Sequence, residues 1–169
     1  MFLSACNNDD PCEGVICFVG NCDNGICVCP VGYTGDDCGT EITPSKILVS
    51  AIRVLEFPGS KENGDPWDIS DNPDLGAILF KNGDLIWESS VIFFDVEFGE
   101  IYSFGSIPPI DITDVEDMYT LNLVDDDDGS VEFMGEYSFS FYASNNGFPT
   151  HPTLGNSPLR FVLDLEYEW

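Results

Sequence analysis

The residues with the clearest capacity for chemistry are carboxylates in two short stretches of the chain. One stretch holds four consecutive aspartates at positions 125–128, followed by Glu132. The other holds Glu62, Asp65 and Asp68. Adjacent carboxylates repel one another, and Ca²⁺ relieves that repulsion because it takes roughly six to eight oxygen ligands at about 2.3–2.6 Å. The pattern predicts a calcium site; the alternative is a solvated acidic turn that binds nothing.

Other catalytic chemistry has little support. His151 is the only histidine, so a Ser-His-Asp site would have to use it, and no nucleophile-elbow or oxyanion-loop sequence accompanies it. No glycine loop of the phosphate-binding type is present. Paired carboxylates for sugar hydrolysis are available among 31 acids, but a small sandwich has little room for a deep cleft. We therefore expect a protein that is not an enzyme.

The charge balance excludes two classes of partner. The formal net charge is −26, from 31 acidic residues against five basic ones: Lys46, Arg53, Lys61, Lys81 and Arg160. Such a surface repels phosphates, which excludes nucleic acid and direct electrostatic docking to anionic lipid. Excess carboxylate for solubility alone is the competing explanation of this acidity. With 43% hydrophobic residues the chain can still bury a core.

The elements that must position the acidic stretches are short strands. From residue 46 onward apolar side chains recur with a period of two, most clearly over 159–168. We expect strands over 47–55, 77–80, 85–87, 91–96, 119–124, 137–141 and 159–168, and a hairpin turn at 82–83 because Asn-Gly tolerates positive φ. Residues 114–118 are the one weak helical candidate. The pattern predicts an all-β fold, an antiparallel β-sandwich.

The cysteines mark a second domain. All seven lie between Cys6 and Cys38, so the chain changes physical class near residue 40. Setting Cys6 aside leaves six thiols for three disulfides, whose pairing spacing alone leaves open. So short a segment cannot bury enough apolar surface and needs covalent links to fold. A zinc site is disfavoured, since one residue separates Cys27 from Cys29 and no histidine is near.

The first residues resemble a bacterial lipobox. Leu3-Ser4-Ala5 precedes Cys6, as in lipoproteins whose cysteine thiol receives the lipid. The Asn-Asn-Asp-Asp run at 7–10 resembles the acidic export signal of surface lipoproteins of the Bacteroidota. The resemblance implies a lipobox and acidic tether over residues 1–11, with lipidation at Cys6 and an extracytoplasmic location at the outer membrane or cell surface. The alternative is an unpaired or intermolecular Cys6.

Residues 12–38 resemble an epidermal growth factor-like module. The features that carry the resemblance are Cys27-Val28-Cys29 and the turn at residues 30–35, within the interval from Cys29 to Cys38. The resemblance implies three disulfides, Cys12 with Cys22, Cys17 with Cys27 and Cys29 with Cys38. Pro11 stands where a calcium-binding copy carries an acid, so we expect a structural spacer or protein contact. Residues 39–45 would be a linker.

Residues 46–169 resemble a C2 domain, a β-sandwich that binds calcium through loops at one end. Gly64-Asp65-Pro66-Trp67 resembles the step after the first loop, and the strand ending in residues 123–127 resembles the one that carries two alternating aspartates. The resemblance implies ligands at Asp125 and Asp127, completed by Asp65 and Glu132. Glu62 and Asp68 are further candidates, and Asp126 and Asp128 replace the pair if the register slips by one. One bound ion is expected, because Gly59 stands where the family carries a first aspartate.

Together these features favour a non-catalytic, lipid-anchored interaction or adhesion module at the cell surface, whose acidic loops bind calcium. Its partner would be a protein or glycan on the cell surface, and its membrane attachment would be through the N-terminal lipid only. One alternative is a carbohydrate-binding module in which Trp67 stacks on a sugar. The other is a structural accessory subunit of an outer-membrane surface complex.

Overall fold

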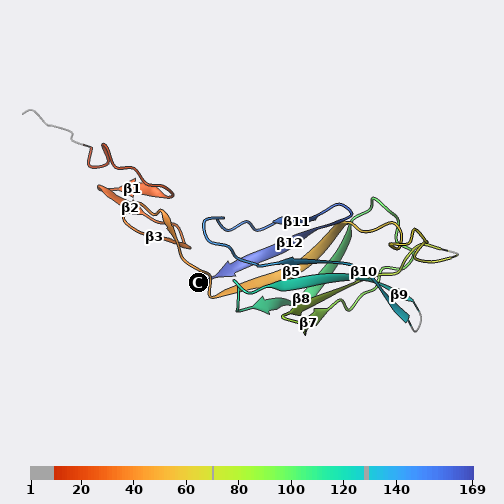
Figure 1. Ribbon diagram of the computed structural model, residues 1–169. Helices are drawn as coiled ribbons and strands as arrows, with labels where there is room; N and C mark the ends of the chain where they lie inside the picture. The colour runs from red at the N-terminus through yellow and green to blue at the C-terminus, as the bar shows by residue number, and fades with distance from the viewer. Residues whose placement is uncertain (1–9, 70, 128–129) are drawn as a thin grey trace, which may run out of the picture. The chain divides into compact units, whose positions relative to one another are not determined.

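The computed structural model describes residues 10–69, 71–127 and 130–169 (Figure 1). The chain divides into two compact units. The first runs to Pro44 and includes Trp169, and the second spans Ser45–Glu168. The predicted lipidation at Cys6 and the alternative ligand Asp128 lie outside the described residues.

The first unit is held together by disulfides. Its strands are β1 (Asn21–Asp23), β2 (Ile26–Val28), β3 (Tyr33–Thr34) and β4 (Thr40–Glu41), paired as β1–β2 and β3–β4. The bonds join Cys12 to Cys22, Cys17 to Cys27 and Cys29 to Cys38, which are the pairs that the module resemblance implied. Among its described residues up to position 44, only Gly32, Cys38 and Pro44 are buried. Strand β4 falls within the stretch expected to be a linker, so residues 40–41 pair back onto this unit.

The second unit is a sandwich of two four-stranded antiparallel sheets, which confirms the predicted all-β fold. One sheet has the order β10-β9-β6-β7 and the other β11-β12-β5-β8. The strands are β5 (Lys46–Glu56), β6 (Leu75–Lys81), β7 (Asp84–Glu88), β8 (Tyr102–Ile112), β9 (Tyr119–Asp127), β10 (Ser130–Phe139), β11 (Thr153–Asn156) and β12 (Leu159–Glu168). No helix within the described ranges could cross a membrane.

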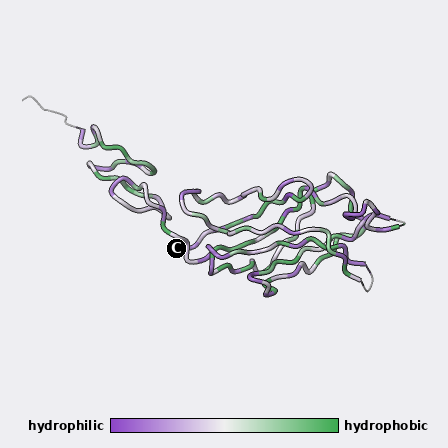
Figure 2. Tube along the Cα trace, viewed as in Figure 1, coloured by the Kyte–Doolittle hydropathy of each residue, from purple (hydrophilic) through white to green (hydrophobic). Residues whose placement is uncertain are grey.

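The core lies between the two sheets. Buried residues alternate with less buried ones along most of β5, β9 and β12, as the period of two predicts, and Figure 2 shows apolar stretches running along the strands. The largest side chains that are almost fully buried are Phe104, Phe161, Ile47, Ile52, Leu75, Leu79, Ile112, Leu121, Leu123 and Leu163. Asn82 and Gly83 both have positive φ at the predicted β6–β7 hairpin turn. The period of two therefore predicted the buried face of β5, β9 and β12.

Two local predictions are wrong. Residues 91–96 form no strand and contribute a single bridge, Phe93 to Leu75, because the backbone turns away at Asp95 with φ of 53°. Residues 114–118 form a turn closed by the hydrogen bond from Asp117 N to Asp114 O, since so short a segment cannot offset the cost of starting a helix. Strand β8 was not predicted; it contains Pro108 and Pro109, which an edge strand tolerates.

All five basic side chains form ion pairs within the sandwich. Lys46 pairs with Glu168 at 3.0 Å, Arg53 with Asp164 at 2.5 Å and Arg160 with Glu56 at 3.3 Å. Lys61 pairs with Glu132, and Lys81 pairs with Asp114 and Asp117. The first unit has no basic residue up to position 44.

Candidate cation-binding site

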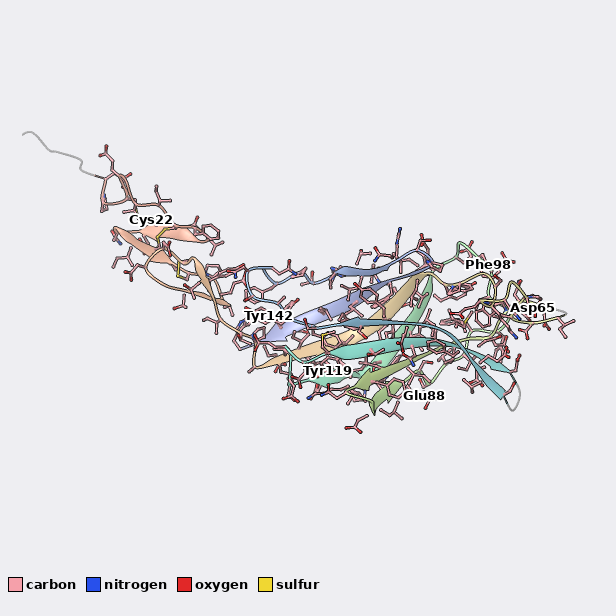
Figure 3. The ribbon with its side chains drawn as sticks, in the orientation of Figure 1. Cys22, Asp65, Glu88, Phe98, Tyr119 and Tyr142 are labelled. Carbon is pink, nitrogen blue, oxygen red and sulfur yellow. A yellow bond between two sulfur atoms is a disulfide. The ribbon has the colours of Figure 1, made fainter. Side chains whose placement is uncertain are left out.

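Three carboxylates from two parts of the sandwich meet at one end of it. Asp125 and Asp127 are alternate residues of β9, so their side chains leave the strand on the same face. Asp68 comes from the loop that joins β5 to β6. One oxygen of each carboxylate lies within 4.8 Å of the others. Side chains at this end of the sandwich, including the labelled Asp65, are drawn in Figure 3.

Asp125 lies in the middle of three paired strands, with β6 on one side and β10 on the other. On β9 it pairs with Leu75, the first residue of β6, and with Glu132 of β10. The Asp125 side chain is fully buried, with 0% exposure. Its Oδ1 accepts a 2.7 Å hydrogen bond from the Asp74 backbone N–H, and its Oδ2 has no hydrogen-bond partner. A buried carboxylate oxygen without a partner is costly, and a bound cation would supply one.

The electrostatics of the group show the same deficit of positive charge. The pKa of Asp68 is raised to about 6, first by burial and then by the charges of Asp125 and Asp127 and a hydrogen bond with Asp127. Burial also raises the pKa of Asp125, and the hydrogen bond from Asp74 opposes that rise. Without a metal ion Asp68 and Asp125 therefore retain a proton more readily than free aspartates do.

Asp74 organises the backbone around the group, and the sequence analysis did not single it out. Its backbone N–H donates a hydrogen bond to Asp125, and its carbonyl oxygen accepts a 2.8 Å hydrogen bond from the backbone N–H of Asp126. Its side-chain carboxylate accepts a 2.9 Å hydrogen bond from the backbone N–H of Asp95. Asp74 thus links β9, the start of β6 and the segment after β7. Its place three residues before the strand predicted over 77–80 was the available signal, but its hydrogen bonds can be recognised only in the folded structure.

The structure brings together three of the six candidate ligands. Asp68, Asp125 and Asp127 form the group, and among the described residues Asp65, Glu62 and Glu132 are not part of it. The Asp65 carboxylate accepts a 2.7 Å hydrogen bond from the Asn63 side chain within its own turn. Glu132 is paired with Lys61, yet it lies near enough to contribute to the raised pKa of Asp125.

Trp67 is part of the packing beside this group. Its side chain is only 8% exposed, and its Nε1–H donates a 2.6 Å hydrogen bond to the carbonyl oxygen of Pro58. The Lys61 amine lies 5.8 Å from the ring centroid. These contacts leave little ring surface for a sugar to stack on.

Comparison with known proteins gives fold similarity only. No protein family and no curated protein matches the chain. One similar solved structure is described as the structure of a C2 domain, with 13% identity over 73% of this chain and 96% of that chain, and a TM-score of 0.44. Another is a C2 domain protein from Ramazzottius varieornatus, with 16% identity over 72% and 89% of the two chains and a TM-score of 0.37.

Proposed function

We propose that the acidic end of the sandwich binds one calcium ion through Asp68, Asp125 and Asp127. The observation that carries the proposal is the fully buried Asp125 carboxylate, whose Oδ2 has no partner while two further carboxylates lie within 4.8 Å. Three carboxylates so close together repel one another unless a cation or a proton intervenes. The raised pKa of Asp68, about 6, is the expected response of the group when the ion is missing.

The donor atoms favour calcium over other metals. All three are carboxylate oxygens, which suit hard cations, whereas zinc prefers thiolate and imidazole ligands. Magnesium usually keeps several waters and binds through only one or two carboxylates. Calcium accepts irregular geometry and roughly six to eight ligands, so three carboxylates leave positions for water or for an oxygen of a partner.

The calcium ion would make this end of the sandwich a docking point. Without it, the acidic group repels anionic surfaces; with it, a partner carboxylate or hydroxyl can complete the coordination. The ion would also tie the β5–β6 loop, through Asp68, to the end of β9. We therefore propose a non-catalytic calcium-dependent interaction or adhesion module, with a protein or glycan as its partner.

Three disulfides support an extracytoplasmic location, because such bonds persist in oxidising compartments. Extracellular calcium modules work at roughly 10⁻⁴ to 10⁻³ M affinity, which three carboxylates can provide. Lipid attachment at Cys6, with display at the outer membrane or cell surface, is part of this proposal. If the sandwich does not bind calcium, the role of structural accessory subunit becomes the better one.

Thermal unfolding with and without calcium tests the proposal. At a calcium concentration tenfold above Kd, binding adds about 1.4 kcal/mol of stability. For a domain of this size that raises Tm by roughly 3–6 °C, and EDTA should reverse the shift. The double variant Asp125→Asn with Asp127→Asn should lose the response, and Asp126→Asn, between them on the opposite face of β9, is the matched control.

A parallel Asp65→Asn variant separates the two possible ligand sets, since the three-carboxylate site predicts an unchanged calcium response. A wild-type melting curve that does not move at millimolar calcium would rule out the site.

A further inference from the structure

A groove runs beside the acidic site along one edge of the sandwich. Its volume is about 920 Å³. Five consecutive residues of β10, 132–136, form one wall. The other wall comes from the segment after β5 and from the start of β12, and its residues are Pro58, Ser60, Lys61, Glu62, Trp67, Pro158 and Leu159.

The backbone of β10 itself lies open to this groove. The register of β10 against β9 shifts between Phe133 and Gly135, so the side chains there do not alternate regularly, and residues 132–136 all line the groove. Strand β10 is at the edge of its sheet and pairs with β9 alone. In the described part of the chain, no hydrogen bond is made to the backbone groups of residues 132–136 that face away from β9. These groups can accept another strand.

The floor of the groove is apolar. Met134 and Leu159 are 6% and 7% exposed, and Phe133, at 56% exposure, stands at the rim. Gly135 has no side chain; a Cβ there would lie 3.7 Å from Leu159 Cδ2 and 3.8 Å from Pro58 Cγ. A Cβ at this position would therefore be in ordinary van der Waals contact with the opposite wall.

The charges around the groove specify the partner further. Glu62, Glu132 and Glu136 line it, and the only lining cation, Lys61, is already paired with Glu132. The rim is therefore negative, and the acidic group containing Asp125 lies beyond Glu132 on the neighbouring strand. A cationic segment is attracted to such a groove, whereas a second copy of this chain, with its formal charge of −26, is repelled.

We propose that this groove binds an extended peptide segment with alternating apolar and basic side chains, which adds as a fifth strand beside β10. The peptide backbone bonds to the open edge of β10, its apolar side chains contact Phe133 and the apolar floor, and its basic side chains face the glutamates. This mode of recognition obtains affinity from main-chain hydrogen bonds and specificity from alternate side chains. The proposal goes beyond calcium binding, because none of the three grouped aspartates lines the groove.

The probe is a capped eight-residue peptide that alternates lysine and valine. Two matched controls carry the same residues, one with N-methylated lysines and the other with N-methylated valines, so charge and composition are kept while one hydrogen-bonding edge is blocked. We expect at least one control to bind tenfold more weakly by calorimetry in EDTA. Equal binding of all three peptides would overturn strand addition.

Hydrogen exchange locates the bound peptide. On binding, alternate amides of residues 132–138 should exchange more slowly, whereas amides of β7, the other edge of the same sheet, should not change. Protection spread over many acidic surfaces, with none on β10, would mean non-specific charge attraction and would contradict the proposal.

Variants of the groove complete the test. Gly135→Val fills the space between β10 and Leu159, in a backbone conformation that is not left-handed, and should weaken peptide binding at least tenfold. Phe133→Ser, on an exposed side chain, should weaken it by a smaller factor and covers the case in which the valine variant does not fold. Phe94→Ala, 72% exposed and outside the groove, is the matched control. Unchanged affinity in both groove variants would overturn the proposal.

The calcium response of Gly135→Val should equal that of the wild type. A chain that binds the peptide but not calcium would contradict only the proposed function, and a chain that binds calcium but not the peptide would contradict only this inference.

Discussion

The two units of this chain reach a fixed structure by different means. The first has three disulfides within residues 12–38 and almost no buried side chains. The second has no cysteine and a continuous apolar core between two sheets. A small segment cannot remove enough apolar surface from water, so covalent links restrict its unfolded chain instead. The stability of the two units should therefore respond to different treatments.

Reduction should have the largest effect, and only on the first unit. Each bridge contributes about 2–4 kcal/mol by restricting the unfolded chain, so loss of all three should unfold residues 12–38. The sandwich should keep its melting temperature, because its strands contain no thiol. Amide resonances of the two units, recorded before and after dithiothreitol, measure both responses in one sample. A parallel loss of sandwich resonances would contradict the expectation that the sandwich stays folded without the disulfides.

A core substitution should have the reverse effect. Phe161 is fully buried on β12 and contacts the rings of Tyr137 and Phe139, with centroids 5.9 and 5.6 Å away. Phe161→Ala should lower the free energy of unfolding of the sandwich by about 3–5 kcal/mol, measured in urea. The disulfide unit should be unaffected. The control is Phe94→Ala, whose ring is 72% exposed and should change stability little.

The acidity of Asp68 should give the sandwich a pH dependence of its own. Since the pKa of Asp68 rises from 3.8 to about 6 on folding, the native state binds more protons than the unfolded state between these values. Stability in EDTA should therefore fall as the pH rises from about 4 to about 6, through this residue, and then level off. Melting curves across this window should show the fall in the wild type and a smaller one in Asp68→Asn. Identical profiles would contradict the raised pKa.

The smallest expected effect is a change in the titration of one side chain, Asp68. Asp125→Asn keeps an oxygen that can accept from Asp74 N–H but removes the charge that raises the pKa of Asp68. The pKa of Asp68 should move from about 6 toward its ordinary value, followed by carboxyl NMR in EDTA. In Asp126→Asn, whose side chain leaves the other face of β9, the titration should change less. A larger shift in Asp126→Asn than in Asp125→Asn would place the wrong side chain beside Asp68.

The sequence predicted elements where local chemistry decides the structure. Alternating apolar residues located β5, β6, β9 and β12, and the module resemblance implied the three disulfide pairs that form. Strand β8 was missed because Pro108 and Pro109 argue against a strand unless its place at a sheet edge is known. Strand β11 was also missed, because it has only four residues and one of them is Gly155.

The candidate site was predicted in part for a related reason. Strand alternation places Asp125 and Asp127 on one face, and that is a local property. The choice between Asp65 and Asp68 depends on the path of the β5–β6 loop, where Asn63 holds Asp65 in a separate turn. The contribution of Asp74 depends on three long-range backbone contacts.

The ion pairing of all five basic side chains affects how two copies of this chain interact electrostatically. Each basic side chain is paired within its own molecule, so an ion pair with a carboxylate of an adjacent copy would have to replace an existing one; the five are Lys46, Arg53, Lys61, Lys81 and Arg160. Copies of this chain, each with a formal net charge of −26, should therefore repel one another at low ionic strength, and this repulsion should weaken as added salt shortens the screening length.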